Sequence, residues 1–513
     1  MAVDNKHPQF SARIADLEQM GECYAGERII KQRREKYLPA TDGMRLDGLT
    51  KAGPDGGKDA YDAYLARAVF PDFVKQGVEA MVGIMHREKA RIEVPDAMKP
   101  LLQKFGSNGE DIWMFQRRLN EWQLLFGRAG ILADAPTGVT VDKAMPFAVL
   151  FAAPRIINWD DGIADQGMQK LEFVTFDESA DERTTGFEWK FEERYRICAM
   201  SGTVQGERQN AEDQSAPTAI GVYQTAKVKQ KDDISSAAWV TPSLGGKTLD
   251  EIPFRFVNTK DLVSQPDDPP LLGLSNLCLA IYRGEADYRQ SLHMQGQETF
   301  VIIGADNDKK TRLGAGARIE LPRQGDAKFV GVSADGLAAQ KECIEADKNL
   351  AGELTSRLFD STGTSYQSGE ALRIRVSAKT ATLRTIALTG AEALRQILVL
   401  MAKWMGLSEA EQAKIVVEPN TDFADTSAAS RTALELTQAK TMGFPISQKS
   451  LHRFAVQQGL TVMTFEEEEK AISDEPPPLP PAQGIGGQSG GLLGRATGGS
   501  RVRRGVGSDA SKE

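Results

Sequence analysis

The sequence has few of the residues that most often carry chemistry. Four cysteines and four histidines are spread over 513 residues, without a CxxC pair or an HxxxH or HExxH arrangement. A zinc site or a metalloprotease motif therefore lacks its ligand spacing, and we expect no metal and no cofactor. Cysteines this far apart predict reduced, buried thiols. The residues in question are Cys23, Cys198, Cys278, Cys343, His7, His86, His293 and His452, with His293 expected in the core or at an interface.

Long apolar runs and an excess of basic charge are also missing. No run approaches the ~20 residues that a membrane helix needs, and the N-terminal stretch lacks an apolar core followed by a cleavage site, so we expect neither membrane insertion nor export. The net charge of −9 argues against a protein that wraps nucleic acid, because tight phosphate binding needs a basic surface. The length predicts about three domains.

Enzymatic motifs are incomplete. Thr241–Thr248, TPSLGGKT, is one residue short of a phosphate-binding loop, since Thr241 stands where the first Gly belongs and Pro253 prevents a useful helix after Lys247. A β-hairpin turn is the better interpretation. The acidic run Glu466–Glu469 is typical of a solvated surface. No Ser/His/Asp set can be assembled, so we expect no enzyme.

The stretch from Leu271 to Met405 organises the chain. Apolar residues at helical spacing predict helices over 273–296 and 336–359, with strand-like pieces between them. The polar segment DSTGTSYQSGEA (360–371) follows, and then a long helix over 376–405. The apolar positions are Leu274, Leu277, Ile281, Tyr288 and Leu292 in the first helix, Leu337, Ile344, Ala351, Leu354 and Leu358 in the second, and Leu383, Ala387, Leu394, Leu398, Met401 and Met405 in the third.

The flanking regions differ in character. The pattern predicts a helix over 11–38, a loop over 40–58 and helices from Asp59 interrupted at Pro71. Residues 145–258 are rich in strand-like segments: FAVLFAA, KLEFVTF, WKFEERYRICAM, AIGVYQTAKV and IPFRFVN. Two amphipathic helices are expected after residue 427, the second capped by Ser447. They could pass for a helix-turn-helix, but two packed helices fit better, because Pro445 lies in the joint and few side chains could read base edges. The Pro/Gly/Ser-rich composition from Asp474 onward predicts disorder.

Five phrases in a fixed order resemble tailed-bacteriophage portal proteins, the head-to-tail connectors. The similarity runs from about Tyr24 to about Gly459. The phrases are LFGRAGILADAP (125–136), RIINWDDG (155–162), EIPFRFVN (251–258), PPLLGLSNLCLAIYRGEADYRQSLHMQG (269–296) and the pair SGEALRIRVSAKTATL with LRQILVLMAKWMG (368–406).

The resemblance implies an α+β portal fold with a β-rich wing, a helical stem, a small β clip, a long spoke helix and a helical crown. On this sequence the expected parts are an N-terminal helical segment and loop (1–58), the wing (59–268), the first stem helix (269–297), the clip (298–335), the second stem helix (336–359), the tunnel loop (360–371), the long helix with its return to the wing (372–426), the crown (427–473) and the disordered tail (474–513).

The implied function is structural. Portal proteins form a homo-oligomeric ring, a dodecamer in the virion, at one capsid vertex assembled in the host cytoplasm. The ring is the channel for DNA packaging and ejection. The implied partners are the terminase large subunit, major capsid and scaffold proteins, head-completion or tail adaptor proteins, and double-stranded DNA passing through without sequence-specific contacts. No membrane is expected.

The tunnel loop is the candidate site, because in the family it projects into the channel and lines the DNA. The residues expected there are Ser361, Thr362, Gly363, Thr364, Ser365, Tyr366, Gln367 and Ser368. Hydroxyl groups can touch phosphates weakly, and glycines let the backbone hinge. A plain surface connection is the alternative for the loop. For the whole chain, the alternatives are a packaging-associated nuclease or ATPase, or a monomeric head-assembly adaptor.

Overall fold

The computed structural model divides the chain into two compact units, Met1–Ala424 and Asp425–Glu513, which we describe separately. Along 295–296, 299–300, 329–330, 334–335, 356 and 369–379 only the backbone is described. The described residues are 3–53, 56–136, 144–162, 170–201, 221–229, 237–296, 299–303, 325–330, 334–356, 369–421, 423, 436–457, 461 and 463–474.

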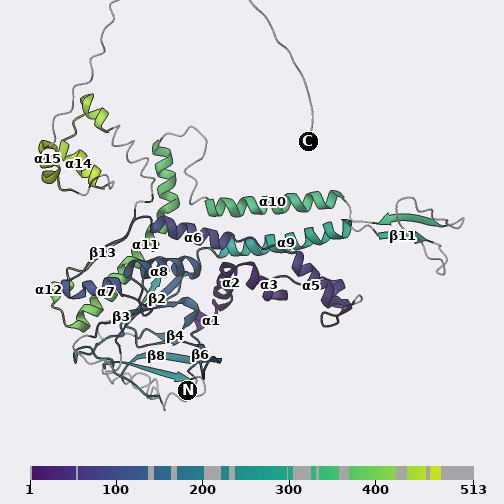
Figure 1. Ribbon diagram of the computed structural model, residues 1–513, viewed down its shortest axis with the longest axis horizontal. Coiled ribbons are helices and arrows are strands. Elements are labelled where there is room, and N and C mark those ends of the chain that lie inside the picture. Colours follow the sequence, from purple (N-terminus) through teal and green to yellow (C-terminus); the bar gives the residue numbers. More distant parts are fainter. Residues whose placement is uncertain are drawn as a thin grey trace, which may run out of the picture. The chain divides into compact units, whose positions relative to one another are not determined.

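Helices form the first part of the first unit (Figure 1). The predicted helix over 11–38 is broken at Gly26, whose φ of +86° suits glycine and ends a helix. The predicted loop over 40–58 contains a helix capped by Thr41, whose hydroxyl accepts the N–H of Met44 at 3.4 Å. The helices are α1 Pro8–Ser11, α2 Ile14–Ala25, α3 Glu27–Gln32, α4 Asp42–Asp47, α5 Gly57–Arg67, α6 Phe73–Met85, α7 Lys99–Gln103 and α8 Ile112–Phe126, with 3-10 turns at Arg34–Lys36, Asp96–Met98 and Ala153–Arg155.

Antiparallel sheets follow. A three-stranded sheet has the order β10-β2-β3, a four-stranded sheet the order β4-β5-β8-β9, and β6 pairs with β7 as a separate hairpin. Each strand segment predicted within 145–258 contains a strand, while β4 lies in RIINWDDG, where no strand was predicted. The bounds are β1 Arg91–Glu93, β2 Arg128–Asp134, β3 Phe147–Ala152, β4 Ile156–Asp160, β5 Phe173–Asp177, β6 Ala180–Arg183, β7 Trp189–Glu192, β8 Arg194–Met200, β9 Tyr223–Lys229, β10 Phe254–Asn258 and β13 Val416–Glu418.

The phosphate-loop-like segment is a tight turn. Leu244 and Lys247 exchange both backbone hydrogen bonds at 3.0 Å. Gly245 and Gly246 between them have φ of +57° and +77°, as a two-residue hairpin turn requires. The prediction of a hairpin turn is confirmed, and the Lys247 carbonyl accepts the indole N–H of Trp404 at 3.1 Å.

The long helices come next: α9 Leu272–Gly296, α10 Ala334–Ser356 and α11 Gly369–Met405, followed by the short α12 Glu409–Gln412. The hairpin of β11 Thr299–Ile303 and β12 Asp326–Val330 separates α9 from α10. The helix α11 begins at Gly369, inside the segment predicted as loop up to residue 371 and seven residues before the predicted start of the long helix. Part of the strand-like stretch predicted between the two helices lies outside the described residues, and so does the apolar residue Leu358.

The second half of α11 is a core helix. Its predicted stripe is confirmed, since Leu383, Leu394 and Leu398 are buried, and it packs against α8, β10 and β2. Within the described residues, Thr380–Met405 alone is long and apolar enough to cross a membrane, with a mean hydropathy of 1.3. The expectation that no segment approaches such a length was wrong. Because 61% of its most apolar window is buried in the protein, packing in the core accounts for the composition.

The second unit contains α14 Gln448–Gln457 and α15 Phe465–Asp474, preceded by a helical stretch over 436–441. The cap predicted at Ser447 is confirmed, because its hydroxyl accepts the N–H of Ser450 at 3.1 Å. The ring of His452 on α14 meets the ring of Phe465 on α15 edge to face at 5.4 Å. Asp474, placed in the tail from the sequence, is the last residue of α15, and 475–513 lie outside the described residues.

Candidate functional site

The helix α9 contacts both the N-terminal helices and α10. It starts where Pro269 and Pro270 end the preceding loop, with the Leu272 N–H bonded to the Pro269 carbonyl at 3.1 Å. Its buried apolar side chains are Leu274, Cys278, Leu279, Ile281, Tyr282 and Ala286. Leu292, predicted on that face, is 41% exposed, and His293, predicted in the core or at an interface, is exposed in this chain.

The N-terminal helices hold α9 through polar contacts. The Gln19 amide donates to Ser275 Oγ at 2.8 Å and to Asn276 Oδ1 at 2.7 Å. Further along, the Tyr64 hydroxyl donates to the Asp287 carboxylate at 2.6 Å. These contacts join residues more than 200 positions apart, so sequence periodicity gave no sign of them.

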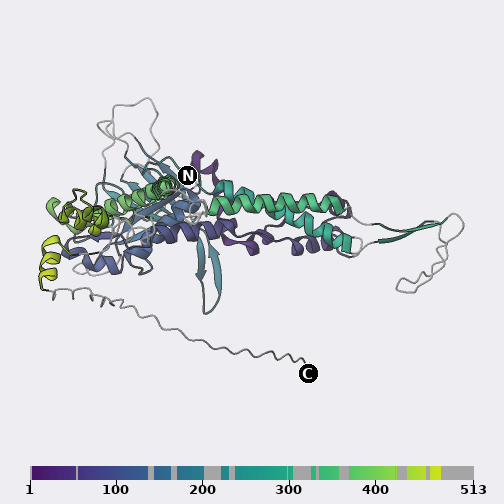
Figure 2. The ribbon, with the colours of Figure 1, turned by 90° about the horizontal axis from the view of Figure 1, so that it is seen from above.

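The helices α9 and α10 lie side by side and antiparallel (Figures 1 and 2). Near one end, Gly77 of α6 faces both Leu274 of α9 and Thr355 of α10, and further along Gly284 faces Ile344. A Cβ on Gly284 would lie 3.2 Å from Ile344 Cγ1, which makes this a close approach. Ile344, Leu337 and Ala351 are buried at a seven-residue spacing, which is a single narrow stripe.

A buried carboxylate joins the two helices. The Glu285 side chain on α9 is 6% exposed and bonds Lys348 of α10 at 2.5 Å and Arg289 at 2.7 Å. Burial by itself raises the pKa of Glu285, but the hydrogen bonds from Lys348 and Arg289 outweigh burial and hold that pKa below its ordinary value. Glu285 is therefore charged at neutral pH and its charge is paired across the helix interface.

The predicted tunnel-loop residues cannot be placed. Ser361, Thr362, Gly363, Thr364, Ser365, Tyr366, Gln367 and Ser368 all lie outside the described residues. The structure gives the two ends of that segment, because α10 ends at Ser356 and α11 begins at Gly369.

A buried polar network contacts α11 at Gly390, in the C-terminal half of the helix. Asn120 and Gln123 of α8 bond each other at 2.8 Å, and the Gln123 amide donates to the Asn258 carbonyl at 2.7 Å. Gly390 of α11 lies against them, since a Cβ there would sit 2.6 Å from Asn120 Nδ2. His86 Nε2 lies 2.9 Å from Asn120 Oδ1, and burial lowers the pKa of His86. Gly390 is thus the residue that lets the two helices meet at this network.

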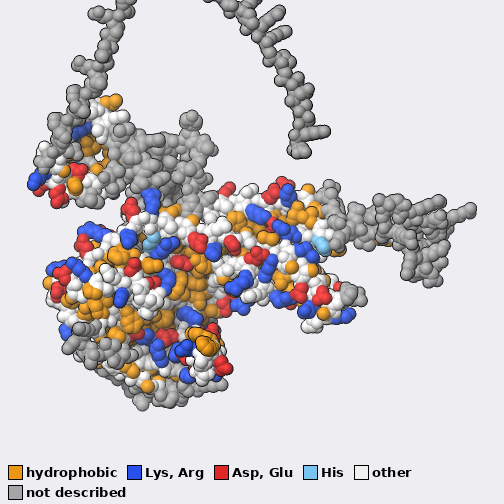
Figure 3. Space-filling view, in the orientation of Figure 1, with side chains coloured by type: hydrophobic (Ala, Val, Ile, Leu, Met, Phe, Trp, Pro, Cys, Tyr) orange, Lys and Arg blue, Asp and Glu red, His pale blue; other side chains and the backbone are white. Residues whose placement is uncertain are grey.

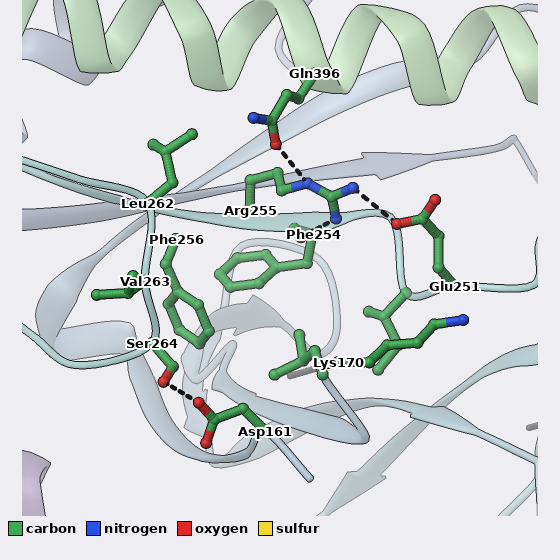
Figure 4. A pocket seen from close by; sticks show the side chains of 12 residues that line it. Asp161, Lys170, Glu251, Phe254, Arg255, Phe256, Leu262, Val263, Ser264 and Gln396 are labelled. Atoms are coloured by element: carbon green, nitrogen blue, oxygen red, sulfur yellow. Dashed lines mark hydrogen bonds and ion pairs between the residues drawn. The ribbon is translucent and has the colours of Figure 1, made fainter. Parts of the chain in front are cut away.

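A pocket of about 340 Å³ lies beside β10 (Figure 4). Arg255 on β10 donates to Gln396 of α11 at 2.9 Å and to Glu251 at 2.7 Å. On the other side of the same strand, the rings of Phe254 and Phe256 line the pocket. Sequence reasoning assigned these residues no role, although the aromatic–cation–aromatic alternation of Phe-Arg-Phe was a visible signal.

The remaining pocket wall is mixed in polarity. Ser264 Oγ bonds the Asp161 carboxylate, and the Lys170 ammonium donates to the Asp250 carbonyl at 2.7 Å. Val263 lies at the rim and is 51% exposed. The pocket therefore offers aromatic and aliphatic walls with both signs of charge at its edge.

Cys23, Cys198 and Cys278 are buried, as predicted, whereas Cys343 on α10 is exposed. Burial raises the pKa of the Cys278 thiol to about 11. Among the described residues, no group of three or more His, Cys, Asp or Glu side chains could hold a metal ion.

Comparison with known proteins gives one family match, described as "Domain of unknown function (DUF4055)", over residues 270–405. That range runs from the residue pair before α9 to the end of α11. A search of curated proteins found no match.

Several solved structures match this chain at low identity. One, described as "Neck of native GTA particle computed with C12 symmetry", has 12% identity and a TM-score of 0.36, covering 76% of this chain and 90% of that chain. The "Neck of empty GTA particle computed with C6 symmetry" has 12% identity and a TM-score of 0.35 over the same shares. The "Virion of native gene transfer agent (GTA) particle" has 12% identity and a TM-score of 0.36, covering 82% of this chain and 99% of that chain. These neighbours are components of phage-like particles, and TM-scores below 0.5 assign no function to this chain.

Proposed function

We propose that this chain is a portal-type structural subunit: it forms a ring at one vertex of a phage-like capsid, through which double-stranded DNA is packaged and ejected. The observation that carries the proposal is the order of elements between residues 272 and 405. Two antiparallel helices, 25 and 23 residues long, flank a β-hairpin and lead into a 37-residue helix. The proposal assigns these elements as the stem, clip and spoke that the resemblance implied, and they lie on the residues that match one family model.

The charge of the second stem helix supports a channel that does not grip DNA. The helix α10 carries five acidic residues and two lysines, and most of its described side chains are exposed. Repulsion between such a helix and phosphates opposes stable binding, so the duplex can move past it. The chain then needs no motor of its own, and the force comes from an ATP-driven terminase that docks on the ring.

Apolar side chains that are exposed on α9 and α10 support the proposal that neighbouring copies pack against these helices. Leu350 and Leu354 of α10 are 44% and 37% exposed, and Leu292 and Met294 near the end of α9 are 41% and 55% exposed. Leu354 was predicted to face the same partner as Ile344, but it lies outside that narrow contact stripe. In a ring, adjacent stems would cover these side chains.

The direct test is the assembly state of the full chain. Light scattering coupled to size-exclusion chromatography, with negative-stain images, should give closed rings with a central channel at micromolar concentration or on co-expression with capsid and scaffold proteins. A monodisperse monomer under both conditions would contradict the proposal and favour an adaptor.

The tunnel loop needs its own test. Deleting Gly363–Gln367 should leave rings intact and block DNA packaging or its retention in particles, because that segment is proposed to line the channel. A deletion of the five residues Glu212–Ala216, in the polar stretch between β8 and β9, is the length-matched control, and ring assembly is its readout. Normal DNA-filled particles from the Gly363–Gln367 deletion would make the segment a plain connection.

A further inference from the structure

The hairpin β6–β7 carries an exposed aromatic face. Trp189 pairs with Arg183 and Phe191 with Asp181, so these side chains share one face of the two-stranded sheet. Phe187, Trp189 and Phe191 are 95%, 67% and 57% exposed. Figure 3 shows hydrophobic side chains gathered where Figure 1 labels β6, and Figure 2 shows this hairpin standing away from the neighbouring strands.

The opposite face of the hairpin is fixed to the rest of the unit. Glu182 bonds Arg194 at 2.5 Å and Glu192 bonds Lys229 at 2.6 Å. The register pairs Glu182 with Lys190 and Ala180 with Glu192, so this face is polar and held by β8 and β9. The aromatic face therefore points away from its own chain.

An aromatic face of this kind needs a cover. A lone two-stranded hairpin is marginally stable in water, and each large aromatic side chain can bury about 150–250 Å². Clustered exposed aromatics on a protruding element mark an interaction surface more often than a solvated one.

The pocket beside β10 has the matching chemistry. Its volume of about 340 Å³ is within the range of sites that enclose a ring-sized group. Phe254 and Phe256 offer aromatic walls, and the Arg255 guanidinium at its edge can stack on an incoming ring. In its sheet, β10 is an edge strand, and side chains from both of its faces line the pocket. The pocket thus follows an edge that needs protection.

The hairpin and the pocket lie at opposite ends of one sheet. The pocket residues Asp161 and Leu171 flank the paired ends Asp160 and Phe173 of β4 and β5. The hairpin follows the other end, where Asp177 of β5 pairs with Tyr195 of β8. The five residues of β5 separate the two by about 15 Å, and the ion pairs of Glu182 with Arg194 and of Glu192 with Lys229 hold the hairpin at its own end of the sheet. A chain cannot readily fill its own pocket, but a neighbour can.

We infer that the aromatic hairpin of one copy inserts into the β10 pocket of the adjacent copy. This rests on the proposed ring. A cyclic assembly needs two different, complementary surfaces on each copy, because every contact runs from one copy to the next in the same direction. The hairpin is the donating surface, the pocket is the accepting surface, and the sheet between them sets their separation.

Cross-linking tests the contact directly. In a Cys343→Ser background, which removes the exposed thiol, copies with Trp189→Cys are co-assembled with copies carrying Val263→Cys and treated with a short bismaleimide. We expect a cross-linked pair of chains as the main product. Leu46→Cys replaces Trp189→Cys in the control, since Leu46 is 88% exposed on α4, and should give at least tenfold less product. Equal yields from the two pairs would overturn the inference.

Assembly of a hairpin variant separates this inference from the proposed function. Trp189→Ala with Phe191→Ala changes exposed residues only, so the monomer should melt as wild type, while the concentration needed for ring formation should rise at least tenfold. Leu46→Ala should assemble normally. If the double variant forms rings as readily as wild type, the inference fails and the proposed ring is unaffected. This holds even if the variant no longer binds another virion protein. A wild type that never forms rings overturns both.

Discussion

The helices α10 and α11 follow each other in sequence and are stabilised in different ways. The helix α11 is surrounded by α8, β10, β2 and β13, and most of its side chains after Leu383 are buried. The helix α10 contacts α9 and α6, and buries Leu337, Ile344 and Ala351 in a single stripe. The first is stabilised by its own chain, whereas the second keeps a large surface available, as a ring subunit requires. Four predictions test this contrast, from the largest effect to the smallest.

Truncating a side chain at the centre of α11 should have the largest effect. Leu394 is fully buried in the core formed with α8, β2 and β10. Leu394→Ala should lower the free energy of unfolding by about 2–5 kcal/mol, because it removes buried methyl groups and leaves a cavity. Leu350→Ala on α10 is the control, since Leu350 is 44% exposed, and should cost under about 1 kcal/mol. Denaturant melts of both variants measure the free energy of unfolding. Equal losses from Leu394→Ala and Leu350→Ala would contradict the difference between α11 and α10.

A glycine in each helix gives a matched pair with opposite expected signs. A Cβ at Gly390 of α11 would lie 2.6 Å from Asn120 Nδ2, whereas a Cβ at Gly352 of α10 would meet nothing within 4 Å. Gly390→Ala should destabilise by about 1–3 kcal/mol through overpacking, and Gly352→Ala should stabilise by about 0.5–1 kcal/mol through helix propensity. Thermal melts give the two signs. A stabilised Gly390→Ala would mean that the α8 network can move aside.

The buried carboxylate on the α9–α10 interface should give a pH-dependent effect. Glu285→Gln should lower the free energy of unfolding by about 1–2 kcal/mol at pH 7, since the charged hydrogen bonds from Lys348 and Arg289 are lost. The pKa of Glu285 is below its ordinary value of 4.5. Its contribution is therefore complete above about pH 4.5 and is lost as the pH falls through the folded-state pKa.

Stability measured from pH 7 down to pH 3 should show the difference between wild type and Glu285→Gln shrinking at the acid end. Glu345→Gln is the control, because its pair with Lys341 at 3.7 Å is about 60% exposed on both sides, and it should change stability by under about 0.5 kcal/mol. A difference that stays constant with pH would show that the charge of Glu285 does not stabilise the α9–α10 interface.

Removing the residues after Asp474 should have the smallest effect. The composition of 475–513 is rich in Pro, Gly and Ser, which predicts a segment that buries little apolar surface. Chains that end at Asp474, the last residue of α15, should melt and assemble as the full chain does. Loss of rings on truncation would show that this segment is ordered between subunits.

Local pattern was sufficient for the long elements. The stripe from Leu383 to Met401 predicted α11, apolar residues at helical spacing predicted α9, and the strand-like segments of 145–258 predicted most of its strands. Boundaries were less certain, because Gly369–Ala371 read as polar loop although helical hydrogen bonds extend through them. The helix within 40–58 was missed, because one cap at Thr41 outweighs a loop-like composition. The predicted tunnel-loop residues lie outside the described residues and stay a prediction.

The sequence by itself determined the long helices and most of the strands, because these depend on side-chain period and on Gly and Pro at fixed positions. It also determined that the phosphate-loop-like segment at Leu244–Lys247 is a turn. The tertiary structure decided what lies next to what. It brought Glu285 next to Lys348 and Gly390 next to Asn120, which are residues distant in the chain. It also placed the β6–β7 hairpin at the opposite end of the sheet from the pocket that Phe254 lines. No local pattern encodes such pairs, because they exist only once long-range packing has fixed which faces meet.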